Sequence, residues 1–306
     1  MSGSPIVITD EVRDALTDGA PIVAMETTIF SRLGLPTPRN AAALEACLRA
    51  VRQGGAVPAI TAVLDGAPTV GVEEPDFDRI LAAESKVARR DLPIAVASGL
   101  STGVTTVSAS LALAAAAGVE VFATGGIGGV HRAVDGDPPH DVSADLAAIA
   151  AFPLVTVSAG AKILLDLAAT LEHLETLSVP VLGLGTDDFP AFHARSSGLP
   201  VPARVETPGE AAAVLRARLA IGDPGGVLLA VPVPEEHALP LADLERAVAA
   251  AHDRASEDRI HGAELTPYLL AVIADETDGR AVDANVALAE HNARVAAEVA
   301  GALTMH

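Results

Sequence analysis

Short runs of apolar, often β-branched residues alternate along the chain with longer segments whose apolar residues recur every three or four positions. The short runs predict buried strands and the longer segments predict amphipathic helices. Strands are expected at 21–28, 57–64, 93–97, 119–123, 154–157, 179–184 and 226–231. Helices are expected at 40–52, 106–117, 143–151, 163–177, 210–220, 241–254, 266–277 and 283–300. This alternation predicts an α/β fold of three layers, α/β/α, with a central, largely parallel sheet covered by helices on both faces.

No repeat, low-complexity tract or linker interrupts the pattern, so one domain is expected over residues 1–306. Half of the residues are hydrophobic, which is enough for a sizeable core. The single Cys47 excludes an internal disulfide, suits a reducing compartment and, within a helical segment, is expected to be a small buried hydrophobe. Since neither a signal-peptide pattern nor a membrane-length apolar span is found, we expect a cytoplasmic protein.

The charge of the chain narrows the choice of partners. The formal net charge is −20, and aromatic residues make up 2% of the chain, with no Trp. Such a field repels nucleic acid and anionic membranes, and few aromatic surfaces are left on which bases could stack. We therefore expect no nucleic-acid or membrane partner, and a phosphorylated substrate would need a locally basic site.

Glu26 is the first candidate for chemistry. Open parallel sheets bind ligands at the carboxyl ends of their strands, and Glu26 ends the first apolar run, in Met25-Glu26-Thr27-Thr28. A buried carboxyl group tends to have a raised pKa, which suits a general acid. The alternative is a strand-end glutamate that accepts hydrogen bonds from backbone amides.

Lysine is rare in this chain: Lys86 and Lys162 are the two lysines among 20 lysine and arginine residues. A lysine amine can become a neutral nucleophile, whereas a guanidinium keeps its proton. Lys162 follows Ser158-Ala159-Gly160-Ala161 and is expected in the first turn of a helix, where the helix dipole and apolar surroundings disfavour an ammonium. A compositional bias towards arginine is the alternative explanation.

Two segments could bind an anion. Residues 85–91 form a basic cluster around Lys86 in an acidic chain, or else an exposed helix end with solvated charges. Residues 124–132, Thr-Gly-Gly-Ile-Gly-Gly-Val-His-Arg, could let backbone amides converge on a phosphate, with His131 and Arg132 directly behind. The third glycine of the dinucleotide-binding pattern is missing, and a tight structural turn is the alternative.

The segment Asp141-Val142-Ser143-Ala144-Asp145 carries two carboxylates four residues apart. If the segment is helical from about Asp141, both carboxylates lie on one face and suit Mg²⁺ or Mn²⁺, with waters completing the shell. Alternatively, Asp141 or Ser143 caps the N-terminus of the following helix.

Together these segments resemble the pseudouridine-5'-phosphate glycosidase family, which includes indigoidine synthase A-like proteins. The matching stretches run in family order along nearly the whole chain, at 26–28, 86–91, 105–107, 122–132, 141–146, 159–162, 189–192, 232–236, 266–267 and 285. The stretch 122–132, Phe-Ala-Thr-Gly-Gly-Ile-Gly-Gly-Val-His-Arg, is specific. Some members carry a fused sugar-kinase domain, for which this chain is too short.

The resemblance implies a lyase-type glycosidase that reversibly converts pseudouridine 5'-phosphate and water to uracil and ribose 5-phosphate in pseudouridine catabolism. It implies that Lys162 attacks C1' and forms an imine with ring-opened ribose, and that Glu26 is the proton donor. It also implies one Mn²⁺ per subunit, with Asp141 as its ligand, and a homotrimer. The substrate-binding positions that it implies are Lys86, Val107, His131, Ser143, Ala144, Asp145 and Asn285.

Two other functions stay open from the sequence. The same lysine chemistry could act on another C-ribosyl phosphate in secondary metabolism, in which case pseudouridine 5'-phosphate would be a poor substrate. A non-catalytic sugar-phosphate-binding protein is the second alternative, although the presence of Glu26, Lys162 and Asp141 speaks against it.

Overall fold

The computed structural model describes residues 6–132, 141–260 and 265–305. The strands are β1 (Val7–Ile8), β2 (Ile22–Met25), β3 (Val57–Leu64), β4 (Ala67–Val70), β5 (Lys86–Val87), β6 (Thr102–Thr105), β7 (Val121–Ala123), β8 (Val130–His131), β9 (Val155–Ser158), β10 (Leu165–Asp166), β11 (Val181–Leu184), β12 (Ala203–Val205) and β13 (Val227–Ala230). The α-helices are α1 (Asp10–Asp18), α2 (Arg39–Gln53), α3 (Phe77–Ala82), α4 (Leu92–Ala97), α5 (Val107–Ala117), α6 (Ala144–Ala151), α7 (Leu167–Thr176), α8 (Pro208–Ala220), α9 (Leu241–Glu257), α10 (Leu265–Glu276) and α11 (Arg280–Thr304). Four 3₁₀ turns join them in the described residues: η1 (Thr28–Phe30), η2 (Glu74–Asp76), η3 (Arg89–Asp91) and η4 (Glu235–His237).

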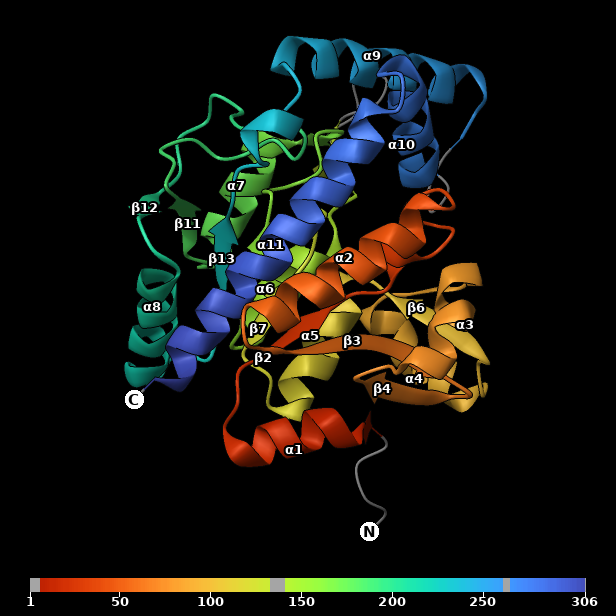
Figure 1. Ribbon diagram of the computed structural model, residues 1–306. Helices are drawn as coiled ribbons and strands as arrows, with labels where there is room; N and C mark the ends of the chain where they lie inside the picture. Colours follow the sequence, from red (N-terminus) through yellow and green to blue (C-terminus); the bar gives the residue numbers. More distant parts are fainter. Residues whose placement is uncertain (1–5, 133–140, 261–264, 306) are drawn as a thin grey trace.

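One large sheet forms the centre of the molecule, with the strand order β1-β4-β3-β2-β7-β9-β13-β11-β12 (Figure 1). Every pairing from β3 through to β12 is parallel. The strands β4 and β6 run antiparallel to β3, and β8 and β10 form a separate antiparallel pair. The predicted largely parallel central sheet is therefore confirmed.

Alternating side chains of the strands enter two different cores, one on each face of the sheet. In β2, for example, Ala24 packs into one core and Val23 and Met25 into the other. The helices α2, α8 and α11 cover the second core, and α1, α5, α6 and α7 cover the first. The long helix α11 packs on β2, β7 and β9 and on the helices α2 and α8, and it passes in front of the sheet in Figure 1. The predicted three-layer arrangement is confirmed.

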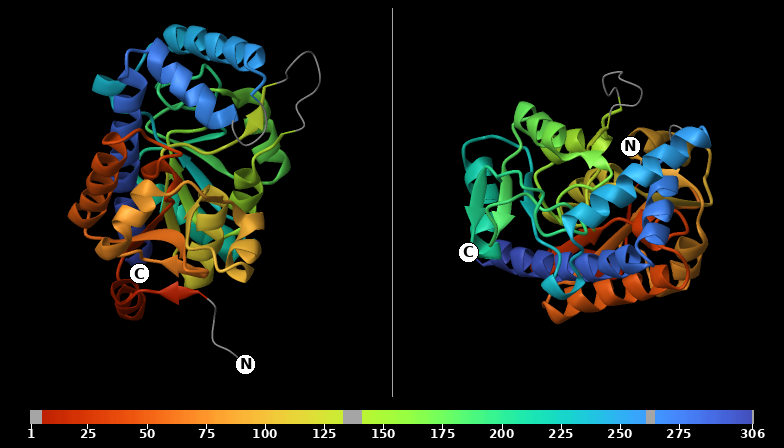
Figure 2. Two further views of the ribbon diagram at one scale, coloured as in Figure 1. Left: turned by 90° about the vertical axis from the view of Figure 1, so that its right-hand side faces the viewer. Right: turned by 90° about the horizontal axis from the view of Figure 1, so that it is seen from above.

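The helices α9 and α10 pack on one another at one end of the molecule. This end is at the top of Figure 1 and at the top of the left view of Figure 2. His252 of α9 brings its Nε2 atom to 3.5 Å from the carbonyl oxygen of Leu164. This contact places α9 beside the segment that follows Lys162. Within the described ranges, no helix is long and apolar enough to span a bilayer.

One predicted element and the start of another were wrong. Residues 93–97, expected as a strand, form the helix α4, because Pro93 suits the first turn of a helix and Asp91 accepts a hydrogen bond from the backbone N–H of Ala88. Its apolar residue Ile94 is 65% exposed, so the run does not belong to a buried strand. The helix expected from 163 begins only at Leu167, where the Asp166 side chain caps it by accepting a hydrogen bond from Ala169 N–H.

Candidate active site

Two strands that run towards each other bring the first part of the site together. Strand β2 pairs with the first half of β3, and β6 pairs with its second half, so both carboxyl ends meet at Thr61 of β3. The hydroxyl groups of Thr27 and Thr105 each donate a 2.7 Å hydrogen bond to the Thr61 carbonyl oxygen. This buried junction holds Glu26, which precedes Thr27, close to the start of α5, which follows Thr105.

Glu26 is 6% exposed, and its Oε1 atom accepts a hydrogen bond from the hydroxyl group of Thr124 after β7. Burial raises the pKa of this carboxyl group from 4.5 to about 7, because desolvation disfavours the charged form. The positive charge of Lys162 and the Thr124 hydrogen bond oppose this shift, and the charge of Asp145 adds to it. At neutral pH, Glu26 therefore has a proton to give and can also take one back.

Lys162 lies in an irregular connection between β9 and β10, and its backbone N–H donates to the Ile127 carbonyl oxygen at 3.2 Å. The expected position in the first turn of a helix was wrong, because α7 begins five residues later. The proposed effect of a helix dipole on Lys162 therefore does not apply. The lysine is instead placed by the turn at Gly160, whose φ is +72°, and by the pairing of Ala161 with Ile127.

The glycine-rich stretch and the start of α6 are tied together by Asp145. Ser143 is the N-cap of α6, and Asp145 is 7% exposed. Its carboxylate accepts hydrogen bonds from Ser108 N–H of α5 at 3.0 Å and from Gly128 N–H at 2.9 Å. The two aspartates thus do not share a helical face, because Asp141 precedes the helix. The capping alternative for Ser143 is confirmed.

Asp141 lies beside His131, because the segment 141–143 pairs with residues 129–131. The Asp141 side chain is 67% exposed, and its Oδ2 atom lies 3.7 Å from His131 Nε2. In the part of the chain that the structure describes, no group of three His, Cys, Asp or Glu residues could hold a metal ion. An exposed single carboxylate fits a hard divalent ion only if the ion keeps most of its water ligands.

Two further elements bring side chains to the same edge of the sheet: β5 carries Lys86, and α11 carries Asn285. Loss of hydration lowers the pKa of the Lys86 ammonium most, and the neighbouring charge of Lys162 lowers it further. The carboxylates of Asp145, Asp91 and Glu26 oppose both effects. Asn285 of α11 has a buried Oδ1 atom without a hydrogen-bond partner in the described residues, and this atom lies 3.2 Å from where a Cβ atom on Gly125 would be.

The structure thus gathers Glu26, Lys86, Asp145 and Lys162 within electrostatic reach of one another. Ser143 and Ala144 begin the helix that carries Asp145, and Val107 begins α5 with a side chain that is 1% exposed. His131 of β8 and Asp141, which precedes α6, lie next to one another beside these residues. Since the Val107 side chain belongs to the core, only its backbone is available to a ligand.

Sequence reasoning named Thr124 only as the start of the glycine-rich stretch and missed its contact with Glu26, and it missed Asn292 behind the site. Thr124 donates to Glu26, and Asn292 of α11 donates to the carbonyl oxygens of Thr124 and Gly125 at 2.8 and 3.2 Å. A signal was present, because Asn292 lies in an otherwise apolar stripe of its helix, seven residues after Asn285.

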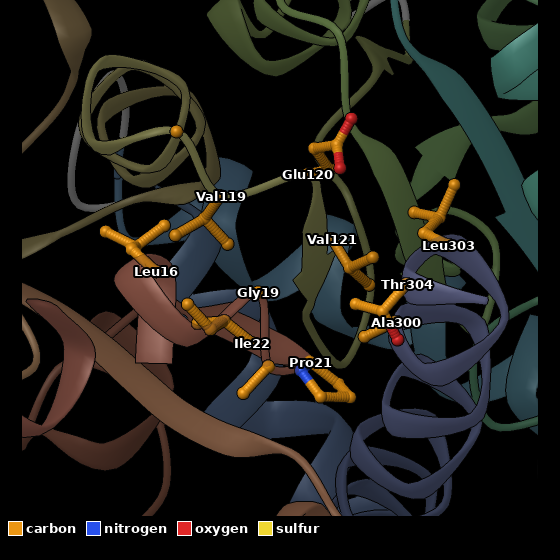
Figure 3. A pocket seen from close by; sticks show the side chains of 12 residues that line it. Leu16, Gly19, Pro21, Ile22, Val119, Glu120, Val121, Ala300, Leu303 and Thr304 are labelled. Atoms are coloured by element: carbon orange, nitrogen blue, oxygen red, sulfur yellow. The ribbon is translucent and has the colours of Figure 1, made fainter. Parts of the chain in front are cut away.

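A hollow of about 170 Å³ lies elsewhere and is not this site. It opens at the other edge of the sheet, where β2 and β7 begin, and contains none of the candidate residues. Figure 3 shows Leu16 and Val119 on one side of it and Ala300 and Leu303 on the other. A smaller cavity, of about 10 Å³, adjoins Glu26 and Thr124.

A parallel sheet with a buried acid and a lysine at the carboxyl ends of its strands defines a small-molecule enzyme of the α/β class. Residues 11–302 match the family model described as indigoidine synthase A like protein, and the chain belongs to this family.

Curated relatives are similar over nearly their full length. A pseudouridine-5'-phosphate glycosidase of Myxococcus xanthus is 48% identical over 295 residues, which cover 95% of this chain and 96% of the relative. A pseudouridine-5'-phosphate glycosidase of Symbiobacterium thermophilum is 48% identical over 299 residues, which cover 96% of both chains.

Two solved structures share the fold. The prealnumycin C-glycosynthase AlnA, in complex with ribulose 5-phosphate, superposes with a TM-score of 0.89 at 34% identity, over 98% of this chain and 97% of that one. An indigoidine synthase A-like protein of Thermotoga maritima superposes with a TM-score of 0.87 at 33% identity, over 99% of both chains.

Proposed function

We propose that this chain reversibly cleaves the C–C glycosidic bond of pseudouridine 5'-phosphate, giving uracil and ribose 5-phosphate, in pseudouridine catabolism. The observation that carries the proposal is the buried Glu26 with a pKa of about 7 in the electrostatic field of Lys162. Relatives of 48% identity that bear the name of this glycosidase support it.

In the proposed reaction, the amine nitrogen of Lys162 bonds to C1' while the bond from C1' to the ring oxygen breaks and that oxygen takes a proton. The nitrogen lone pair then forms a C=N bond to C1' as the bond from C1' to C5 of uracil breaks, and C5 takes a proton. Glu26, whose pKa is raised by burial to about 7, supplies protons to the departing atom. Water hydrolyses the imine and returns the free amine and ribose 5-phosphate.

The other residues bind the substrate in this proposal. Lys86 offers a positive charge to the sugar phosphate, while the backbone at Val107 and the start of α6 offer N–H groups. His131 and Asn285 supply polar atoms for the ribose or the base. The residues concerned are Lys86, Val107, His131, Ser143, Ala144, Asp145 and Asn285.

Asp141 would hold one Mn²⁺ per subunit, with waters and substrate oxygens filling the remaining positions. When bound, the ion would neutralise negative charge on the substrate. We further propose a homotrimer as the assembly, which sedimentation equilibrium of the purified chain tests.

The experiment that tests the function is reductive trapping. The protein is incubated with ribose 5-phosphate and Mn²⁺, reduced with borohydride, digested and mapped by mass spectrometry. A single reduced ribose-phosphate adduct on the Lys162 peptide is expected. The Lys162→Arg variant and a sample without sugar phosphate are the controls. Absence of an adduct in folded, metal-loaded protein would contradict the imine.

A second candidate substrate is favoured by the similarity to the C-glycosynthase AlnA. In that case the same lysine chemistry would join or cleave another C-ribosyl phosphate. Comparison of kcat/KM for pseudouridine 5'-phosphate with that for other aromatic C-ribosyl phosphates separates the two candidates. A protein that binds ribose 5-phosphate but traps no adduct and turns over neither class would be a binding protein.

A further inference from the structure

Helix α11 reaches the back of the site through one buried amide. Asn292 is 1% exposed, and its Nδ2 group donates to the carbonyl oxygens of Thr124 and Gly125. Its Oδ1 atom is buried without a hydrogen-bond partner in the described residues. An apolar side chain would avoid leaving an acceptor unpaired, so the value of asparagine here lies in its two donated hydrogen bonds.

These bonds fix the residue that contacts the proposed proton donor. The Thr124 N–H group donates to Val157 of β9 at 3.0 Å, and the Gly125 carbonyl oxygen also accepts from Ala159 N–H at 2.9 Å. Thr124 is therefore held between β9 on one side and α11 on the other. The residue is 5% exposed, and its hydroxyl group donates to Oε1 of Glu26.

The direction of this hydrogen bond has a chemical consequence. Because Oε1 of Glu26 accepts from Thr124, the proton of the neutral carboxyl group is directed to Oε2. We propose that Thr124 and Asn292 are positioning residues: Asn292 holds the backbone of Thr124, and the Thr124 hydroxyl orients Glu26 so that Oε2 presents the proton to the substrate. This inference rests on the proposed function of Glu26.

The test uses isosteric variants and the pH dependence of turnover. Thr124→Val removes the hydroxyl group, and Thr124→Ser retains it. For Thr124→Val we expect kcat to fall at least roughly tenfold, with KM changed less than about twofold, since the proton donor and not substrate binding is affected. Thr124→Ser should restore most of kcat. Thr156→Val is the matched control, because Thr156 is also buried but its hydroxyl group has no hydrogen-bond partner among the described residues.

The pH profile distinguishes positioning from a loss of packing. Glu26 faces the charges of Lys162, Asp145 and Lys86, and the Thr124 hydrogen bond lowers its pKa. Removing the hydroxyl group therefore raises that pKa, and the alkaline limb of the kcat profile should move to higher pH in Thr124→Val. Packing defects alone would not move this limb.

Asn292→Ala tests the second half of the inference. It should lower kcat in the same direction as Thr124→Val, and the double variant should lose little more than Thr124→Val alone, because both act through one hydrogen bond. Losses that multiply in the double variant would overturn the link between the two residues.

A measurement without substrate separates this inference from the proposed function. The Glu26 carboxyl group can be titrated by the infrared difference between proteins with and without the Glu26→Gln substitution, once in the wild-type background and once in the Thr124→Val background. A higher Glu26 pKa in Thr124→Val supports the positioning even if pseudouridine 5'-phosphate is not turned over. An unchanged titration together with wild-type kcat would overturn it.

Discussion

At the scale of single residues, the proposed chemistry depends on what lysine can do and arginine cannot. We expect Lys162→Arg to keep the fold and lower kcat by about a thousandfold or more, because the charge survives while the nucleophilic amine is lost. Steady-state turnover and the trapping experiment measure this, with circular dichroism to confirm the fold.

The second lysine of the chain provides the matched control. Lys86→Arg keeps a positive charge near the site, so we expect a smaller loss, in KM more than in kcat. Borohydride should still trap the sugar phosphate on Lys162 in this variant. Appreciable turnover by Lys162→Arg would contradict the imine mechanism.

Glu26→Gln tests the acid. The amide keeps the size of the side chain and can still accept from Thr124, but it has no proton to transfer. We expect kcat to fall by roughly 10²- to 10⁴-fold, with a much smaller change in KM, as is typical of general acids. A rise in KM at unchanged kcat would show that Glu26 serves only binding.

Sequence reasoning found the residues that are unusual for their surroundings. Glu26 interrupts an apolar run, and Lys162 is one of two lysines, so each was visible without a structure. The roles of Thr124 and Asn292 were not, although Asn292 stands out in the apolar stripe of its helix, because these roles come from a contact between segments 168 positions apart. No local pattern records such a contact.

At the scale of elements, the turn after β9 places Lys162. Gly160 has a φ of +72°, and a Cβ atom there would lie 2.1 Å from the backbone carbonyl oxygen of Pro190. We expect Gly160→Ala to destabilise the protein by roughly 3–5 kcal/mol and to abolish trapping at Lys162, since the backbone must move. Urea unfolding and the trapping experiment measure the two effects.

Gly185 is the control for this turn. It has a φ of +61°, but no atom lies within 4 Å of the position of its Cβ atom. Gly185→Ala should therefore cost only the conformational strain, roughly 1–2 kcal/mol, and leave trapping intact. Equal costs at the two positions would show that the contact with Pro190 is not important.

The sequence predicted the parallel strands well because each is a short apolar run buried on both faces. It failed at 93–97, where a short apolar run is equally compatible with a helix and where Pro93 decides the outcome. It also failed between Lys162 and Leu167, since apolar spacing there continues the pattern of α7 although Asp166 caps the helix later. The ends of helices depend on capping and on tertiary pairing more than on the periodicity of apolar residues.

At the scale of the whole molecule, charge acts in two opposite ways. The net charge of −20 repels a phosphorylated substrate at long range. Lys86 and Lys162 lie within electrostatic reach of one another in the candidate site. Their positive charges can therefore attract the phosphate group of such a substrate only at short distances. The fold therefore concentrates its two lysines where an anion would have to bind.

Two buried groups make the stability of the whole molecule depend on pH in opposite directions. Glu26 has a folded pKa of about 7 against an ordinary 4.5, so the folded state binds more protons and stability falls as pH rises between these values. His193 is 2% exposed, and burial lowers its pKa from 6.5 to about 3, so stability falls as pH drops through that range.

Between about pH 4.5 and 6.5 the two effects oppose each other, and the wild type should show a nearly flat contribution from them. His193→Leu removes one effect, so its free energy of unfolding should gain up to about 5 kcal/mol relative to wild type as the pH falls from 6.5 to 3.

Glu26→Gln removes the other effect, so its free energy of unfolding should gain about 3 kcal/mol relative to wild type as the pH rises from 4.5 to 7. Urea unfolding across this pH range measures both, with His237→Leu, an exposed position, as the control. Parallel pH curves for wild type and His193→Leu would contradict this prediction, because they would show that His193 binds a proton equally well in the folded and the unfolded state.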